Sequence, residues 1–130
     1  MNILREARVE RIKSDSPSAT ALLQVLSMLD GRSIPEEILT KGAKDAGLKD
    51  YPRNKTAYFE ARKVLVESSL VTRDKELTDH LCVLRYVQET VRSQLDLPLF
   101  REVFNAATIL QSAVWPFIDS GVPSEAGQPR

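Results

Sequence analysis

The sequence predicts a mainly α-helical domain that carries a small two-stranded antiparallel β-hairpin, arranged like a winged helix. Three observations predict this fold class. Apolar residues recur at helical spacing in several segments, and two short β-prone runs interrupt them. After an N-terminal helical extension, the order is three helices, a hairpin and further helices. Three helices followed by a hairpin form the winged variant of the helix-turn-helix. Because an isolated hairpin is only marginally stable in water, we expect it to pack on the helices that precede it.

The first helices are expected at residues 2–13 and 17–29. The first of these segments places its few apolar residues on one side and charged residues elsewhere. Before the second segment, Ser16 is a suitable N-cap residue, and Pro17 suits the first helical position. Gly31 is expected to end this helix, since glycine readily adopts the left-handed conformation of a C-cap.

The third helix is expected to open at Ser33, because Ser33 and Glu36 have the spacing of a capping box. Glycine and proline residues make positions 42–54 mostly loop. The fourth helix is expected at about residues 56–69, where an apolar stripe returns.

The β-prone runs at residues 70–72 and 81–84 are separated by a polar stretch and form the predicted hairpin. A fifth helix follows, and a sixth, at 98–115, carries the longest amphipathic stripe of the chain before Pro116 ends it. That stripe consists of Phe100, Val103, Phe104, Ala107, Leu110 and Val114. The predicted organisation is therefore an N-terminal helical extension at 1–13, a winged-helix domain at 14–96, a packing helix at 97–117 and a flexible tail at 118–130.

The charge balance and the cysteine content restrict the partners and the compartment. Lysine and arginine total 18, and aspartate and glutamate also total 18, so the net charge is zero. A neutral chain exerts no long-range attraction on nucleic acid or on an anionic membrane. Cys82 is the single cysteine, which excludes an intramolecular disulfide and favours a reducing compartment. We therefore expect a cytoplasmic protein that does not span a membrane, since no apolar run approaches the required ~20 residues.

The sequence contains no recognisable catalytic motif, and we expect no enzymatic activity. A phosphate-binding glycine-rich loop, a nucleophile elbow and a zinc-protease motif are all missing. His80 and Cys82 are the two zinc ligands of the usual kind, whereas a zinc site needs three or four. His80 is interpreted as a surface residue of the hairpin, and Cys82 as a small core residue on the other face of its strand. No metal site is expected.

Three stretches of the sequence resemble a known family. They are residues 16–39, residues 61–73, and residues 81–92 followed by Phe104, Ala107, Leu110 and Trp115-Pro116. Together they resemble the winged-helix region that follows the NB-ARC nucleotide-binding domain in fungal NLR-like STAND signalling proteins, in which tetratricopeptide repeats commonly come next. The resemblance covers roughly residues 14–117. It leaves open whether the chain is a fragment of a longer protein or a stand-alone paralogue.

In that family the winged helix folds back on the nucleotide-binding domain and holds the ADP-bound off state. The family's marker is an MHD-type motif after the second wing strand, often Val-His-Arg in fungal members, whose histidine contacts the ADP phosphate. The matching positions here are Val83, Leu84 and Arg85. Leucine cannot donate a hydrogen bond to phosphate, so Arg85 is the remaining cofactor-binding candidate. We expect ADP or ATP to bind only if the chain is joined to an NB-ARC domain.

The resemblance implies a non-catalytic regulatory and interaction module. Its expected partner is an NB-ARC domain or repeats, in cis or in trans. The candidates for an exposed apolar patch are Tyr51, Phe59, Trp115 and Phe117. The alternative is a stand-alone winged-helix DNA-binding protein, but the basic pair of its reading helix, Arg62 and Lys63, is flanked by acidic residues. Nucleic acid is therefore not the favoured partner.

Overall fold

The computed structural model describes residues 3–77 and 79–118, with side-chain surroundings for residues 7–77 and 79–113. The helices are α1 (Ile3–Asp15), α2 (Pro17–Leu26), α3 (Glu36–Lys41), α4 (Lys55–Glu67), α5 (Arg85–Ser93) and α6 (Leu97–Ile118), with a short 3₁₀ turn, η1, at Ala43–Asp45. The strands are β1 (Ile34–Pro35), β2 (Val71–Arg73) and β3 (His80–Val83). The fold is mainly α-helical with one small antiparallel sheet, which confirms the predicted class.

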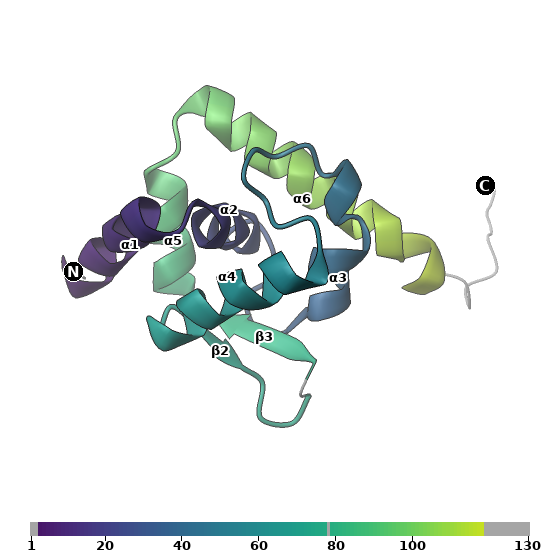
Figure 1. The fold of residues 1–130 in the computed structure, drawn as a ribbon, viewed down its shortest axis with the longest axis horizontal. Coiled ribbons are helices and arrows are strands. Elements are labelled where there is room, and N and C mark those ends of the chain that lie inside the picture. The colour runs from purple at the N-terminus through teal and green to yellow at the C-terminus, as the bar shows by residue number, and fades with distance from the viewer. Residues whose placement is uncertain (1–2, 78, 119–130) are drawn as a thin grey trace.

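Helix α2 lies at the centre of the molecule. It packs against α1, α4, α5 and α6, and the small sheet lies below α4 in the view of Figure 1. Most residues of α2 are buried, including Leu22, Val25 and Leu26. The helix begins as predicted, because the Ser16 hydroxyl accepts a hydrogen bond from the backbone N–H of Ala19. A helix that is apolar on most sides is stable only in such a buried position.

The predicted two-stranded hairpin is wrong in one respect, because the sheet has three strands in the order β1-β3-β2. Ile34 pairs with Leu81, and Ile34 is buried. The capping box is also wrong: the N-cap of α3 is Pro35, without a side-chain cap bond, and the Ser33 hydroxyl faces Asp74. Proline has no N–H to donate to a ladder, which suits a short strand at the edge of the sheet.

Gly31 does not take the left-handed conformation that was predicted for it. Helix α2 ends earlier, at Leu26, and among the glycines that the structure describes the one with a positive φ is Gly47. The Gly31 carbonyl instead accepts a hydrogen bond of 2.7 Å from the backbone N–H of Val83. A Cβ at position 31 would collide with the Val83 carbonyl oxygen and touch the Gln88 side chain. Glycine is needed here because β3 comes so close to the backbone.

Helix α4 ends in a Schellman motif that leads directly into β2. The N–H of Ser69 bonds to the Val66 carbonyl, and the N–H of Leu70 bonds to the Leu65 carbonyl. Ser69 has φ 63°, the left-handed value that this motif requires. Leu65 and Leu70 are both buried, as the accompanying apolar contact of the motif demands.

Helix α6 runs along one side of the molecule and contacts α2 and α3 (Figure 1). Its buried face consists of Val103, Ala106, Ala107 and Leu110. The helix extends to Ile118, so the predicted end at Pro116 is wrong; a proline in the last turn removes only one bond of the ladder. Residues 119–130 of the predicted tail lie outside the described residues. Among the described helices, none is both long and apolar enough to cross a membrane.

Candidate functional site

The residues that the resemblance matches to an MHD-type motif surround the junction between β3 and α5. Val83, the last residue of β3, is buried. Leu84 is the N-cap residue of α5, and its side chain is 57% exposed. Arg85 begins α5, lies at the surface and forms an ion pair of 3.3 Å with Glu89. Tyr86 is 60% exposed. We call Leu84, Arg85 and Tyr86 the α5-start surface.

The inner face of α5 fixes the orientation of this surface. Val87 and Val91 are buried in the core, and the buried Gln88 amide donates hydrogen bonds to the carbonyls of Leu26 and Leu29, at 2.9 and 2.7 Å. The Leu26 carbonyl also accepts a 3.3 Å hydrogen bond from the backbone N–H of Leu29, so the Gln88 amide adds a second bond there and ties α5 to the turn that follows α2. Because α5 is held in this way against α2, Tyr86 projects to the outside.

Val83 is buried and Arg85 is exposed, so these two side chains do not face the same surface. Arg85 is strongly exposed, and its partner Glu89 lies one turn along the same helix. An exposed ion pair of this kind contributes little to stability. The guanidinium can consequently leave Glu89 for an incoming phosphate or carboxylate at small cost.

The predicted apolar patch is not assembled as expected. Phe59 on α4 is 49% exposed, and the Arg62 guanidinium lies 4.8 Å from its ring centre. Tyr51 as an exposed candidate is wrong: it is buried, and its hydroxyl donates a 2.6 Å hydrogen bond to the Leu39 carbonyl. Burial raises the pKa of Tyr51. Trp115 and Phe117 fall within α6, but their side chains lie outside the described residues.

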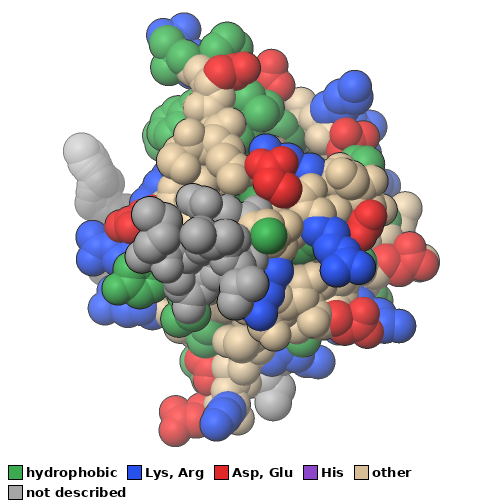
Figure 2. Space-filling model, turned by 90° about the vertical axis from the view of Figure 1, so that its left-hand side faces the viewer, with side chains coloured by type: hydrophobic (Ala, Val, Ile, Leu, Met, Phe, Trp, Pro, Cys, Tyr) green, Lys and Arg blue, Asp and Glu red, His purple; other side chains and the backbone are tan. Residues whose placement is uncertain are grey.

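Sequence reasoning missed an apolar row on α6. Leu97 and Phe104 are 62% and 54% exposed, and the half-buried Phe100 lies between them. The spacing of three and then four residues puts all three on one side of the helix. Figure 2 shows apolar side chains gathered at the upper end of the molecule, where α6 begins. Phe104 had been assigned to the buried stripe, yet the small Ala106 occupies that face.

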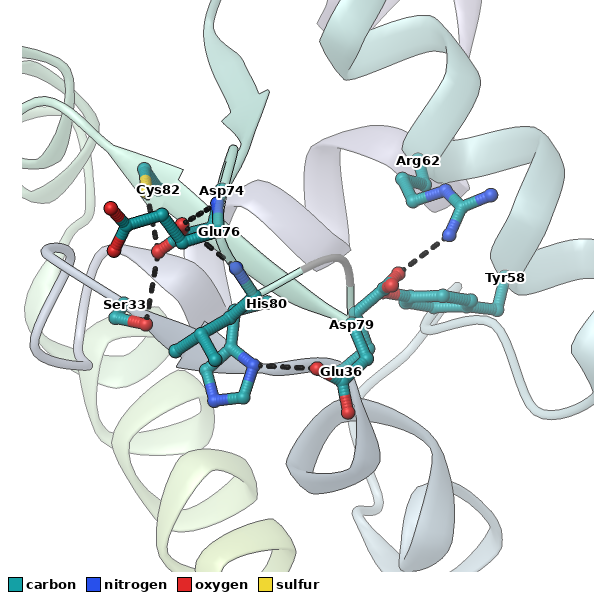
Figure 3. A network of polar contacts seen from close by, with 10 residues as sticks. Ser33, Glu36, Tyr58, Arg62, Asp74, Glu76, Asp79, His80 and Cys82 are labelled. Carbon is teal, nitrogen blue, oxygen red and sulfur yellow. Dashed lines mark hydrogen bonds and ion pairs between the residues drawn. The ribbon is translucent and has the colours of Figure 1, made fainter.

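A polar cluster joins α3 to α4 (Figure 3). One carboxylate oxygen of Glu36 accepts a 2.5 Å hydrogen bond from the Tyr58 hydroxyl and a 2.7 Å bond from Arg62. Both charged side chains are largely buried. Burial and the Glu36 carboxylate raise the pKa of Tyr58 well above its usual value. The role of this cluster is structural: it links α3 to α4, and Tyr58 and Arg62 are both already hydrogen-bonded to Glu36.

A second polar cluster shapes the tip of the hairpin (Figure 3). The Asp74 carboxylate accepts hydrogen bonds from the backbone N–H groups of Leu77 and Glu76, which lower its pKa. The Cys82 thiol donates to the Arg32 carbonyl at 3.1 Å, and burial together with the Asp74 charge raises the thiol pKa. A thiol with a raised pKa is a poor nucleophile at neutral pH.

His80 and Cys82 lie on the same face of β3, contrary to the expectation that they face opposite ways, because residues two apart share a face of a strand. The His80 ring nitrogen lies 2.9 Å from the Asp79 carboxylate. Within the described residues, no group of three or more metal-ligating side chains comes together.

The comparisons with known proteins give one match. A family model described as "Domain of unknown function (DUF7779)" matches residues 10–98, which is more than half of the chain. No curated protein and no solved structure matches. The matched range includes the α5-start surface and both polar clusters, and it ends at the second residue of α6. The chain therefore belongs to the DUF7779 family.

Proposed function

We propose that this chain is a non-catalytic regulatory module that packs against a partner protein, as the winged helix of a STAND signalling switch does. The observation that carries the proposal is the α5-start surface. Two large apolar side chains, Leu84 and Tyr86, are more than half exposed on either side of Arg85. Exposed apolar groups next to a charged group suit a protein interface better than solvent.

The topology supports the winged-helix interpretation. Helix α2, strand β1, helices α3 and α4, and strands β2 and β3 follow one another in the chain, and β3 lies between β1 and β2. Helix α5 begins two residues after the end of β3, the strand that would be the second strand of the wing. In the family that the sequence resembles, the residues at this point face the nucleotide-binding domain.

The proposed partner is an NB-ARC domain, in cis or in trans, with repeats as a further contact. Arg85 would reach a phosphate or a carboxylate of that domain, while Leu84 and Tyr86 would fill an apolar surface. Leu84 offers no hydrogen bond to a nucleotide, so we expect no ADP or ATP binding by this chain alone. We place the module in the cytoplasm, where Cys82 stays reduced.

DNA binding is the weaker alternative. The Arg62 guanidinium on α4 is largely buried and paired with Glu36, so it does not face outward for a phosphate. On the face drawn in Figure 2, acidic and basic side chains alternate and no basic stripe is visible. A duplex-binding surface needs a concentration of positive charge.

The test is isothermal titration calorimetry of this chain with an ADP-loaded NB-ARC domain. The NB-ARC domain is the one whose gene lies nearest to the gene for this chain. We expect saturable binding, and we expect the double variant L84S/Y86S to bind at least about tenfold more weakly, as loss of central apolar contacts does. The matched control is Leu77→Ser, which removes a large apolar side chain, 48% exposed, from the hairpin and should leave the affinity unchanged.

Failure of the wild-type chain to bind, or equal affinities for the wild type and L84S/Y86S, would contradict the proposal. Circular dichroism melting of each variant shows that it is folded. A gel shift with duplex DNA at two salt concentrations tests the alternative, since affinity that falls steeply with salt would favour DNA binding.

A further inference from the structure

A cavity of about 480 Å³ lies between α1, α2, α5 and α6, away from the α5-start surface. Its walls are mostly apolar and include Val9, Ile12, Leu23, Val91, Leu95 and Leu99. Its rim is charged and exposed, with Lys13 and Lys49 beside Asp50 and Glu102. The volume lies in the range of small-molecule sites, and a cavity between helices is a common place for one.

One wall group lacks a hydrogen-bond partner. Gln94, the C-cap residue of α5, lines the cavity, and its side-chain oxygen is buried without any partner. It is the single buried side-chain N or O atom among the described residues that has none. An unpaired buried acceptor is unfavourable. The oxygen has almost no accessible surface, so it meets a donor in the cavity only after the Gln94 amide turns toward that space, which the rest of the side chain already lines.

We propose that this cavity is a binding site for a small apolar molecule that carries one hydrogen-bond donor. The apolar body fills the space between Leu23, Val91 and Leu95. The Gln94 amide turns toward the cavity, and its oxygen then accepts the hydrogen bond from the donor. The inference goes beyond the proposed function, because none of these residues belongs to the α5-start surface.

The lining chemistry favours this occupant over a charged molecule. The walls offer mainly apolar contact together with the neutral polar side chains of Thr20, Gln24 and Gln94, while charges of both signs are confined to the rim. A buried anion or cation would lack a charged partner inside and would lose its hydration. A neutral amphipathic molecule loses little hydration and gains both the apolar contact and the hydrogen bond.

The probes are 1-naphthol and 1-methoxynaphthalene, which share a ring system and differ in the donor. Each is titrated into the ¹⁵N-labelled chain and followed by NMR. We expect saturable amide shifts confined to α1, α2, α5 and the start of α6. The naphthol should bind about two- to tenfold more tightly than the ether, the usual worth of one neutral hydrogen bond.

Two variants and one control test the hydrogen-bond acceptor and the cavity volume separately. Gln94→Leu removes the unpaired oxygen, so both probes should then bind equally, whereas Gln111→Leu, at an exposed position outside the cavity, should keep the preference. Ala21→Leu fills the space and should abolish binding of both probes. Thermal unfolding checks that each variant folds, and the Gln94 and Gln111 pair decides the question if Ala21→Leu does not.

Absence of saturable shifts with 1-naphthol would overturn the site. Equal binding of the two probes to the wild type would overturn the role of Gln94. Shifts that map to the α5-start surface or the α6 row would assign the binding to those surfaces and would also overturn the proposal.

Discussion

Ser69 holds its backbone at φ 63° although it carries a Cβ atom. The conformation persists because the Schellman bonds at the end of α4 and the burial of Leu70 both require it. A left-handed residue with a side chain costs roughly 1–2 kcal/mol relative to glycine. The backbone of Ser69 is therefore slightly strained, and this strain accompanies the tight turn that leads from α4 into β2.

Ser69→Gly should raise the free energy of unfolding by about 1 kcal/mol, because glycine adopts this φ without strain. Ser68→Gly is the matched control: Ser68 has φ −84°, so glycine there only adds backbone entropy to the unfolded chain and should lower stability by about 0.5–1 kcal/mol. Urea unfolding of both variants provides the measurement. A loss of stability in Ser69→Gly would show that the serine side chain makes a contact worth more than the strain.

Single residues mark the limit of what the sequence predicts. Ser16 was predicted as an N-cap and is one, since its partner lies three residues away. Gly31 was assigned to a helix end, yet it is required by the approach of Val83 from a distant part of the chain. Local hydrogen bonds can be inferred from neighbouring residues, whereas a steric requirement set by a remote strand cannot.

At the scale of elements, the longer helices were predictable because each has its own apolar periodicity, whereas α3 was predicted from a capping box that does not form. Strand β1 was not, because Ile34–Pro35 is too short to show any alternation. It exists only because Ile34 pairs with Leu81 and is buried against the core. The same remote pairing turned the expected capping serine, Ser33, toward Asp74.

The hairpin tip should make stability depend on pH in the acid range. Asp74 has a folded pKa below its usual 3.8, because backbone N–H groups bond to the carboxylate. Its contribution is therefore present above the unfolded value of about 3.8 and is lost as pH falls through the folded value. Asp79 is lowered likewise, by its hydrogen bond with His80, and the pKa of Asp30 falls to about 2 beside Arg32.

Asp74→Asn tests the first of these groups. The variant should be less stable than the wild type at pH 7, and the difference should shrink between pH 4 and pH 2 as the wild-type carboxylate becomes protonated. Urea unfolding at several pH values measures this. A difference that stays constant from pH 7 to pH 2 would show that the charge of Asp74 has no part in holding the turn.

At the scale of the whole molecule, the candidate site was only partly predictable. The exposed position of Arg85 follows from the hairpin preceding α5, which the sequence does indicate. The burial of Tyr51 depends on a loop folding back over the end of α3, so that the Leu39 carbonyl meets its hydroxyl. The cavity beside Gln94 depends on four helices at once and has no signal in any one segment.

The family match ends at residue 98, near the start of α6. This raises the question, at the scale of the whole molecule, of whether α6 unfolds cooperatively with the other helices. The structure argues that it does. Leu110 is fully buried, and α6 contacts α2, α3 and η1. Gly42 at the end of α3 comes so close that a Cβ there would lie 2.7 Å from the Ala113 Cβ.

Leu110→Ala should therefore destabilise the entire domain by about 2–5 kcal/mol, as leucine truncations in a packed core do. Ile109→Ala is the matched control, because Ile109 is the next residue and is exposed; its cost should stay below about 1 kcal/mol. Urea unfolding gives the energies, and hydrogen exchange shows where they act. If Leu110→Ala speeds exchange in α6 alone and leaves the amides of α2 and α4 protected as before, α6 is an appendage rather than part of the core.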